Sequence, residues 1–383
     1  MTFVRACTLL IVLAIVAGGC GGDGNRSDAG PERQERPELQ KLLEQIRKAG
    51  SPGAIAITRR RSGTWLGATG NAVLKPHRPM RTDDRIRVAS ITKSFVATVV
   101  LQLVDERRLS LDDTLEQLLP GMLRFGRQLT VRRLLNHTSG FASGDDSFAE
   151  SEALYDKFLA DVRFDVPVRT KIALADGRPL QFEPGTSFHY TNSGYDVLGL
   201  IVERVTGDEL AKVLADRIFE PLELRATAFE PQPLPPNADV AHGYAIAGSD
   251  LAVASWAGPQ DVTGASLLGR WASAGIVSNV QDLVTFYSAL LGGDLLPRPL
   301  LGEMQKTVPI GSPVVQAGFG IFRYKLPCGG YAWGHGGSTL GYSSMALANK
   351  DGSHVVAVGA NAFASGAFYD LVEKTARDLY CRT

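Results

Sequence analysis

The sequence predicts an α/β (α+β) fold in which a sheet domain is divided by an inserted helical region. Two short β-like runs stand near the start, at 53–58 and 64–69, and further β-rich runs gather after residue 318. From about 109 to 264 the apolar spacing is mostly helical and is interrupted by loops rich in Gly, Pro and Asp. This order is typical of a split α/β domain beside an all-helical region.

The elements of the N-terminal part follow from apolar periodicity. Residues 37–49 carry apolar side chains at helical spacing. The charged, Gly-containing segment 59–63 between the two β-like runs predicts a hairpin. Residues 91–106 are apolar around most of the helix circumference, so we expect this helix in the middle of the protein.

The later elements follow from the same periods. Helices are expected at 111–119, 130–135, 149–159, 195–205, 282–291 and 367–380. Strands are expected at 318–324, 331–334, 342–348 and 354–360. The folded body should span 37–383, with its α/β part at about 37–108 and 271–383 and its helical part at about 109–270.

The composition is ordinary for a globular protein, with 383 residues of which 44% are hydrophobic and 21% charged. Lys plus Arg equals Asp plus Glu at 40 each, which gives no electrostatic reason to expect nucleic acid as a partner. The six histidines lack zinc-ligand spacing, and no Gly-rich loop has phosphate-binding spacing. We therefore expect neither a metal site nor a cofactor.

The N-terminus predicts export. Arg5 and the short apolar run 6–16 read as a signal peptide, because the run is too short to span a bilayer. Small residues then lead directly to Cys20, as in the lipobox of bacterial lipoproteins, although Ala17 stands where that motif usually has Leu. We expect a lipoprotein signal peptide at 1–20 and a flexible tether at 21–36, so that the membrane is reached only through a lipid on Cys20. Ordinary secretion is the alternative.

Only Cys328 and Cys381 then remain in the folded body. In an oxidising exported compartment such a pair is more typical of a disulfide than of a metal or catalytic site. We expect a structural bridge that ties the end of the chain to a strand near the active site.

Three motifs indicate chemistry. The first is a Ser-x-x-Lys at 90–93 (SITK). Residues three apart share one face of a helix, so the Lys93 amine can approach the Ser90 hydroxyl. A serine becomes a good nucleophile when a neighbouring base takes its proton, and a lysine can be that base when burial lowers its pKa. The free N–H groups of the helix start also favour a developing oxyanion.

The second motif is Tyr-x-Asn at 190–192, and the third is the segment 335–338 (HGGS) after an expected strand. Tyr190 could carry a proton to the leaving group, and Asn192 could hold a substrate amide. His335 could polarise or protonate the cluster, Gly337 could allow close approach of an acyl group, and the Ser338 N–H could be an oxyanion donor.

Together the motifs resemble those of the penicillin-recognising serine hydrolases: class C β-lactamases, D-alanyl-D-alanine carboxypeptidases and esterases of the same scaffold. The similarity includes 87–94 (RVASITKS), 134–140 (LLNHTSG), 182–195 and 274–283, and it covers roughly residue 50 to the end. The resemblance implies an antiparallel sheet flanked by helices beside an all-helical region, with the site between them.

The resemblance also implies roles for single residues. Ser90 is then the nucleophile, Lys93 and Tyr190 share the base and acid work in an order that stays open, and Asn192 positions the substrate. The backbone N–H groups of Ser90 and Ser338 form the oxyanion hole. His335 in place of Lys, and a cysteine before the third motif paired with one near the C-terminus, are similar to the carboxypeptidases.

One departure affects the substrate. Gly336 stands where the family usually has Thr or Ser, whose hydroxyl helps to hold a substrate carboxylate. Ser338 or Arg323 could compensate. We therefore expect an acyl-enzyme hydrolase of a D-alanyl peptide or a β-lactam, with β-lactams as substrates or inhibitors. A carboxylesterase and an inactive lipoprotein that binds peptidoglycan fragments are the alternatives.

Overall fold

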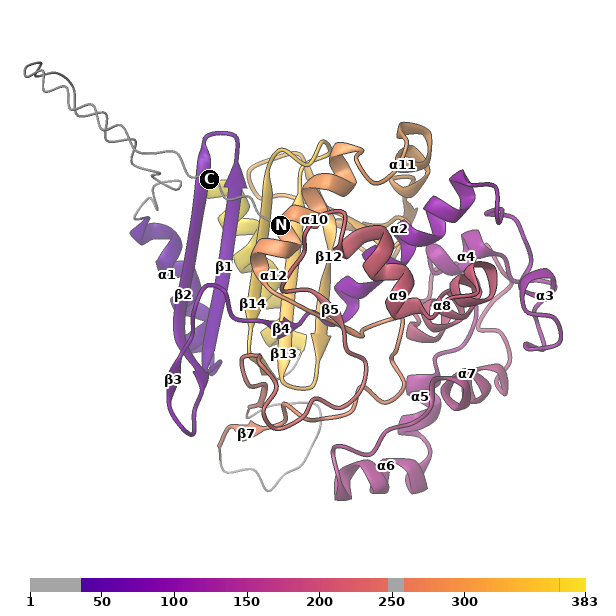
Figure 1. The fold of residues 1–383 in the computed structure, drawn as a ribbon, viewed down its shortest axis with the longest axis horizontal. Coiled ribbons are helices and arrows are strands. Elements are labelled where there is room, and N and C mark those ends of the chain that lie inside the picture. The colour runs from indigo at the N-terminus through magenta and orange to yellow at the C-terminus, as the bar shows by residue number, and fades with distance from the viewer. Residues whose placement is uncertain (1–35, 247–257, 365) are drawn as a thin grey trace, which may run out of the picture. The chain divides into compact units, whose positions relative to one another are not determined.

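The computed structural model describes residues 36–246, 258–364 and 366–383 (Figure 1). The expected signal peptide, Cys20 and nearly all of the expected tether lie outside the described residues. None of the helices in the described ranges is both long and apolar enough to cross a membrane.

A nine-stranded antiparallel sheet forms the α/β part, in the order β3-β2-β1-β14-β13-β12-β11-β10-β9. Its strands are β1 (Gly53–Arg60), β2 (Gly63–Val73), β3 (Arg78–Pro79), β9 (Val308–Pro309), β10 (Val315–Ala317), β11 (Phe322–Lys325), β12 (Tyr331–Thr339), β13 (Tyr342–Ala348) and β14 (Val355–Ala360). The pairing of β1 with β14 sets Ala54 opposite Ala360 and so joins the N-terminal hairpin to the C-terminal strands. The expected α/β fold with an antiparallel sheet is confirmed.

Helices cover both faces of this sheet. Alternate residues of a strand point to opposite faces, and Ala56 and Ile57 of β1 accordingly join two different apolar clusters. Ala56 lies in the cluster with α1 (Pro37–Lys48) and α12 (Gly366–Arg382), whereas Ile57 lies in the cluster with α10 (Val280–Gly292). Figure 1 shows α1 beside the β1–β2 hairpin. The sheet is therefore buried on both sides, which makes it a rigid support for the site.

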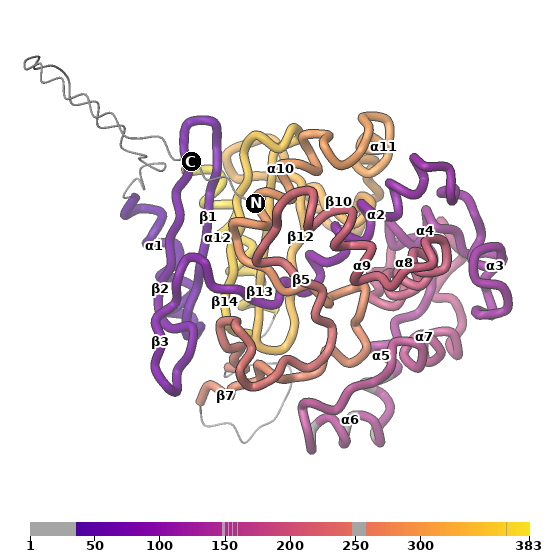
Figure 2. Tube along the Cα trace, viewed as in Figure 1, coloured from indigo at the N-terminus to yellow at the C-terminus, as the bar shows by residue number. Residues whose placement is uncertain are grey.

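The helical part packs around α2 (Thr92–Asp105) and α8 (Asn192–Thr206). The shorter helices are α3 (Leu115–Leu118), α4 (Val131–Leu135), α5 (Gly144–Ala149), α6 (Glu152–Ala160), α7 (Val168–Asp176) and α9 (Leu210–Leu214), which continues into a π-helical turn at Ala215–Phe219; α11 (Arg298–Met304) follows α10. Figure 2 shows α3 to α8 gathered beside the sheet, with α2 nearest to it. As expected, α2 is buried around most of its circumference, because it lies between the two parts.

The expected all-helical segment 109–270 also contains short strands, which is a correction. These are β5 (Ala228–Phe229), β6 (Tyr244–Ala245) and β7 (Gln260–Asp261). They build two three-stranded sheets with β4 (Ile86–Arg87), β8 (Ile276–Ser278) and β15 (Ala362–Phe363). Two-residue strands are too short to give an alternating pattern, so the sequence offered no signal for them.

Several expected elements also have different bounds. The helix expected at 111–119 is confined to α3, and the strand expected at 318–324 begins only at Phe322 in β11. The helix expected at 149–159 begins only at Glu152 as α6, because Ser151 before it has extended backbone angles, and Ala149 is instead the last residue of α5. The strand expected at 331–334 runs on to Thr339, so the third motif lies within β12 rather than after it. The strand beyond residue 334 was not predicted, because it contains Gly336 and Gly337 and glycine is rare in strands.

Candidate active site

Ser90 lies on a tight turn at the start of α2. A 3₁₀ turn at Ala89–Ile91 leads directly into the helix, and Ala89 has a left-handed φ of 47°. Left-handed backbone is costly for a residue other than glycine and persists where the surroundings hold it. Here the Val88 N–H donates to the Ile276 carbonyl (3.0 Å), and the Ser344 hydroxyl donates to the Val88 carbonyl (3.0 Å). The turn that presents Ser90 is therefore held from two strands.

Lys93 lies one helical turn from Ser90 and is fully buried. Its Nζ is 3.1 Å from Ser90 Oγ, 2.7 Å from Asn192 Oδ1 and 2.9 Å from the Ser273 carbonyl oxygen. Burial lowers the pKa of Lys93 from 10.5 to about 7. In the neutral amine, two N–H groups can donate to Asn192 and Ser273, which leaves the lone pair directed at the Ser90 hydroxyl. This geometry suits a lysine that accepts the serine proton.

The Asn192 side chain is held in one orientation from both ends. Its Oδ1 accepts from Lys93, while its Nδ2 donates to Asp145 Oδ2 (2.5 Å). Asp145 also pairs with Arg270 Nε (3.0 Å) and with the buried Lys171. These cations and the Asn192 amide hold the pKa of Asp145 below its usual value despite its burial. An ionised Asp145 thus directs the Asn192 oxygen toward Lys93.

A second carboxylate, that of Asp196 on α8, lies near Lys93. Asp196 is fully buried, and its Oδ1 accepts from the Ser273 N–H (3.0 Å), whose carbonyl in turn accepts from Lys93. Burial raises the pKa of Asp196 to about 7, against the opposing charges of Lys171 and Lys93. The negative charge of Asp196 in turn favours the protonated form of Lys93. Lys93 and Asp196 therefore titrate as a linked pair.

The Tyr190 ring covers Lys93. The amine is 4.8 Å from the ring centroid, and the His137 ring packs against the same ring at 4.4 Å. Burial raises the pKa of Tyr190, and the neighbouring Ser90 hydroxyl opposes this shift. The Tyr190 hydroxyl is buried and has no hydrogen-bond partner among the described residues. Tyr190 is therefore a neutral phenol at the site, able to pass on a proton.

His335 is buried beside Phe322, with ring centroids 5.0 Å apart. Its Nδ1 lies 2.5 Å from the Gly336 carbonyl oxygen, which can only accept, so Nδ1 carries the proton. Burial lowers the pKa of His335 to about 3, and the Lys93 charge acts in the same direction. His335 is thus neutral near pH 7, and its Nε2, which has no hydrogen-bond partner among the described residues, can accept a hydrogen bond but has no proton to deliver.

The two glycines of the third motif permit close approaches on the two sides of β12. A Cβ atom on Gly337 would lie 2.0 Å from the Val88 carbonyl oxygen, which belongs to the turn before Ser90. A Cβ atom on Gly336 would lie 1.7 Å from the hydroxyl of Tyr369 on α12. Gly337 thus lets β12 lie against the Ser90 turn, and a tyrosine occupies the space of the side chain that position 336 lacks.

Most of the predicted site residues line one open cavity of about 750 Å³, whereas Gly337 lies against the Ser90 turn and not on the cavity wall. Ser90, Tyr190, Asn192, His335 and Ser338 all lie on its wall, while Lys93 is buried behind Ser90. The Ser338 hydroxyl is buried without a hydrogen-bond partner in the described part of the chain. The structure therefore brings all the predicted catalytic residues together around one space.

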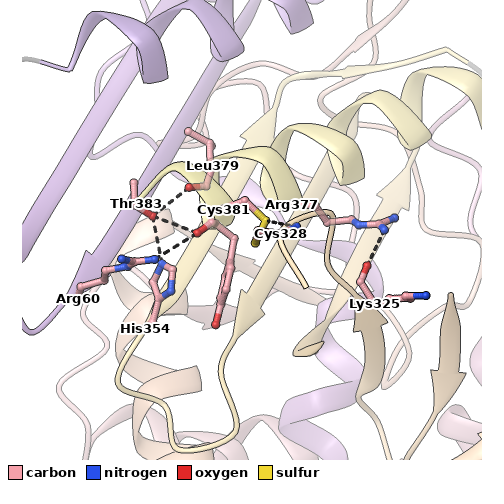
Figure 3. The surroundings of a disulfide bond; sticks show 9 residues. Arg60, Lys325, Cys328, His354, Arg377, Leu379, Cys381 and Thr383 are labelled. Carbon is pink, nitrogen blue, oxygen red and sulfur yellow. Dashed lines mark hydrogen bonds between the residues drawn. A yellow bond between two sulfur atoms is a disulfide. The ribbon is translucent and has the colours of Figure 1, made fainter. Parts of the chain in front are cut away.

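Arg323 and the cysteine pair lie away from this wall. Arg323 donates to Gln316 and stacks over Tyr331, and it does not line the cavity, so it cannot replace the hydroxyl missing at Gly336. Cys328 and Cys381 form a disulfide with a Cα–Cα distance of 5.6 Å, which ties the end of α12 to the turn before β12 (Figure 3).

Several site residues were not foreseen. Asp145, Lys171, Asp196 and Arg270 build the charged network behind Asn192 and Lys93, and none of them stands in a motif with recognisable spacing. Tyr369 and Glu373 line the cavity from α12, where the residue pattern indicates only a helix. Among the described residues no group of three or more metal-ligating side chains is present.

The chain is similar to known proteins in both sequence and structure. A crystal structure of a D-stereospecific amidohydrolase from Streptomyces sp. is 35% identical, covers 91% of this chain and 100% of its own, and superposes with a TM-score of 0.78. Penicillin-binding protein 4* of Bacillus subtilis (strain 168) is 26% identical over 82% of this chain and 69% of its own length.

Esterase EstB of Burkholderia gladioli is 35% identical over 48% of each chain. The family model named Beta-lactamase matches residues 39–379, which is most of the chain and contains every predicted catalytic residue. The resemblance inferred from the motifs is confirmed, and the chain belongs to the Beta-lactamase family.

Proposed function

We propose that the chain is a serine amidohydrolase that forms an acyl-enzyme at Ser90. One observation carries the proposal: the buried amine of Lys93, with its pKa lowered to about 7, is 3.1 Å from the Ser90 hydroxyl. About half of such amines are neutral at pH 7, so a base is present where the nucleophile needs it.

In the first step neutral Lys93 accepts the Ser90 proton while Oγ bonds to the substrate carbonyl carbon. The backbone N–H groups of Ser90 and Ser338 are the proposed donors to the oxyanion. The carbonyl then re-forms, the bond to the leaving group breaks, and that group takes the proton from Lys93 through the Tyr190 hydroxyl. Water, activated by the same groups, attacks the ester on Ser90 and releases the acid.

A D-configured amide is the substrate class that we favour, whether a D-alanyl peptide, a β-lactam or a smaller amide. The likeness to the Streptomyces D-stereospecific amidohydrolase supports this class. Recognition of a terminal carboxylate has weaker support, because position 336 lacks a hydroxyl. Among the described residues, Arg270 is also the one arginine on the cavity wall, and it is already paired with Asp145.

A carboxylesterase is the second candidate. The likeness to Esterase EstB supports it, as does the absence of a side chain at Gly336, because an ester of a simple acid needs no carboxylate anchor. Both candidates use the same Ser90 acyl-enzyme and differ only in the leaving group.

We also propose export with a lipid on Cys20. The disulfide between Cys328 and Cys381 supports an oxidising compartment. Metabolic labelling with palmitate, lost in Cys20→Ala, is the expected result, and equal labelling of both proteins would refute lipidation.

The enzymatic proposal is tested with residues 23–383 and the matched variant Ser90→Ala. We expect Ser90-dependent hydrolysis of D-phenylalanine amide, with an acyl mass on the Ser90 peptide after rapid quenching. A D-alanyl-D-alanine peptide, a cephalosporin and a nitrophenyl ester of a simple acid then rank the substrate classes. Preference for the nitrophenyl ester would favour the esterase, and no Ser90-dependent turnover of any of them would leave a binding protein.

A further inference from the structure

The wall of the cavity that α12 forms is rich in hydrogen-bond acceptors. Tyr369 and Glu373 stand four residues apart on this helix, so they share one face, and both line the cavity. Tyr324 of β11 lines the same region and interacts electrostatically with both. We call these three residues the α12 corner. It adjoins the third motif, because the Tyr369 hydroxyl fills the space beside Gly336.

Two oxygen atoms of the α12 corner have no hydrogen-bond partner among the described residues and could therefore bind a ligand. The Tyr369 hydroxyl has no hydrogen bond to any described residue, although burial raises the pKa of its phenol. Glu373 accepts from Arg377 through Oε1 alone (3.2 Å), and that arginine is also held by the Lys325 carbonyl (2.5 Å). Glu373 Oε2 has no partner in the described part of the chain. One carboxylate oxygen and one phenol oxygen are therefore unused.

The negative charge of Glu373 in the α12 corner favours a cationic ligand over an anionic one. Burial raises the pKa of Glu373, which Arg377 opposes, so the ionised carboxylate is incompletely compensated. A carboxylate ligand would be repelled, whereas an ammonium group would pair with Glu373 and lie beside two phenol rings, which attract cations. Among the described residues, the other charged side chain on the cavity wall is Arg270, which is engaged by Asp145 together with Lys171.

We infer that Tyr369 and Glu373 bind a free ammonium group of the substrate, so that the enzyme acts on acyl donors with a free amino group, such as amides and esters of amino acids. This inference rests on the proposed function, because the same cavity contains Ser90. It differs from carboxypeptidase recognition, in which the substrate presents a terminal carboxylate.

Binding to the Ser90→Ala protein tests the inference without catalysis. Calorimetry compares D-phenylalanine amide with its N-acetyl derivative, which has no ammonium group. We expect the free amine to bind about 10- to 100-fold more tightly, as a charge-assisted hydrogen bond warrants. Adding Glu373→Gln should remove most of this preference, and adding Tyr369→Phe should reduce it by a smaller factor.

The matched control is Asp378→Asn, which breaks an ion pair with Lys374 (2.5 Å) on the same helix without touching the cavity. It should leave the preference intact. Equal affinity for the two ligands, no measurable binding of the amine, or an unchanged preference in a folded Glu373→Gln protein would each overturn the inference. Ser90-dependent turnover in the parent enzyme would then still support the proposed function, so the two failures are distinguishable.

Discussion

The protonation of Lys93 should control the pH dependence of acylation. With a pKa of about 7, about half of the Lys93 amines are neutral at pH 7, whereas an ordinary lysine would be neutral in about one molecule in 3,000. Because the base must be neutral to accept the Ser90 proton, kcat/KM should rise with pH and level off above about pH 8. Burial thus supplies about a thousandfold more active base at neutral pH.

Asp196→Asn is the perturbation that tests this origin. The carboxylate of Asp196 stabilises the ammonium form of Lys93, so its removal should lower the pKa of Lys93 further. Asparagine keeps an oxygen for the Ser273 N–H (3.0 Å), so the packing should persist. A buried charge interaction at an effective dielectric near 20 is worth on the order of 1–3 kcal/mol. Its loss should move the acidic limb of the pH profile of kcat/KM to lower pH by about one to two pH units.

The assay is kcat/KM for D-phenylalanine amide, or for whichever substrate the panel identifies, between pH 4.5 and 9. The matched control is Asp282→Asn, which changes a half-buried carboxylate whose pKa burial also raises, but which bonds Thr227 away from the cavity. The acidic limb of the pH profile of Asp282→Asn should lie at the same pH as that of the parent enzyme. An unchanged limb in a folded Asp196→Asn enzyme, or a shift to higher pH, would refute the reasoning.

Three further perturbations have definite expected results. Asp145→Asn should lower the free energy of unfolding by about 3–5 kcal/mol, because it leaves the buried Lys171 ammonium without its counter-charge. A calorimetric melting curve that matches that of the parent protein would contradict this. Gly336→Ala should reduce kcat/KM at least about tenfold, since the methyl group would overlap the Tyr369 hydroxyl. Adding Tyr369→Phe should restore part of the lost kcat/KM. Wild-type kinetics in the single variant would argue against this packing. Phe95→Ala should lower the free energy of unfolding, measured with denaturant, by about 3–5 kcal/mol, because this buried ring on α2 stacks on Phe286 with ring centroids 3.6 Å apart. A loss below about 1 kcal/mol would show that the core around α2 relaxes into the space.

The antiparallel sheet and its division along the chain could be predicted from the sequence because long strands and helices have strong apolar periods. Strands 342–348 and 354–360 correspond closely to β13 and β14. The short strands β5, β6 and β7 could not be predicted, since two residues carry no alternation. The third motif was placed after a strand instead of within β12, because its glycines weaken the strand pattern.

The local chemistry of the site follows from short-range sequence alone. A Ser and a Lys three residues apart at a helix start must lie on one face, so the pairing of Ser90 with Lys93 needed only local geometry. The meeting of Tyr190, Asn192 and His335 around that pair was expected only through the resemblance. The assigned catalytic roles and the lipid on Cys20 stay predictions.

The electrostatics and the shape of the cavity arise only from tertiary packing. The pKa of Lys93 depends on burial between the two parts of the fold and on Asp196, which reaches it through Ser273. Likewise, Tyr369 reaches Gly336 only because α12 packs across β13 and β14. Desolvation and close approach arise between elements far apart in the chain, and no local pattern of residues encodes them.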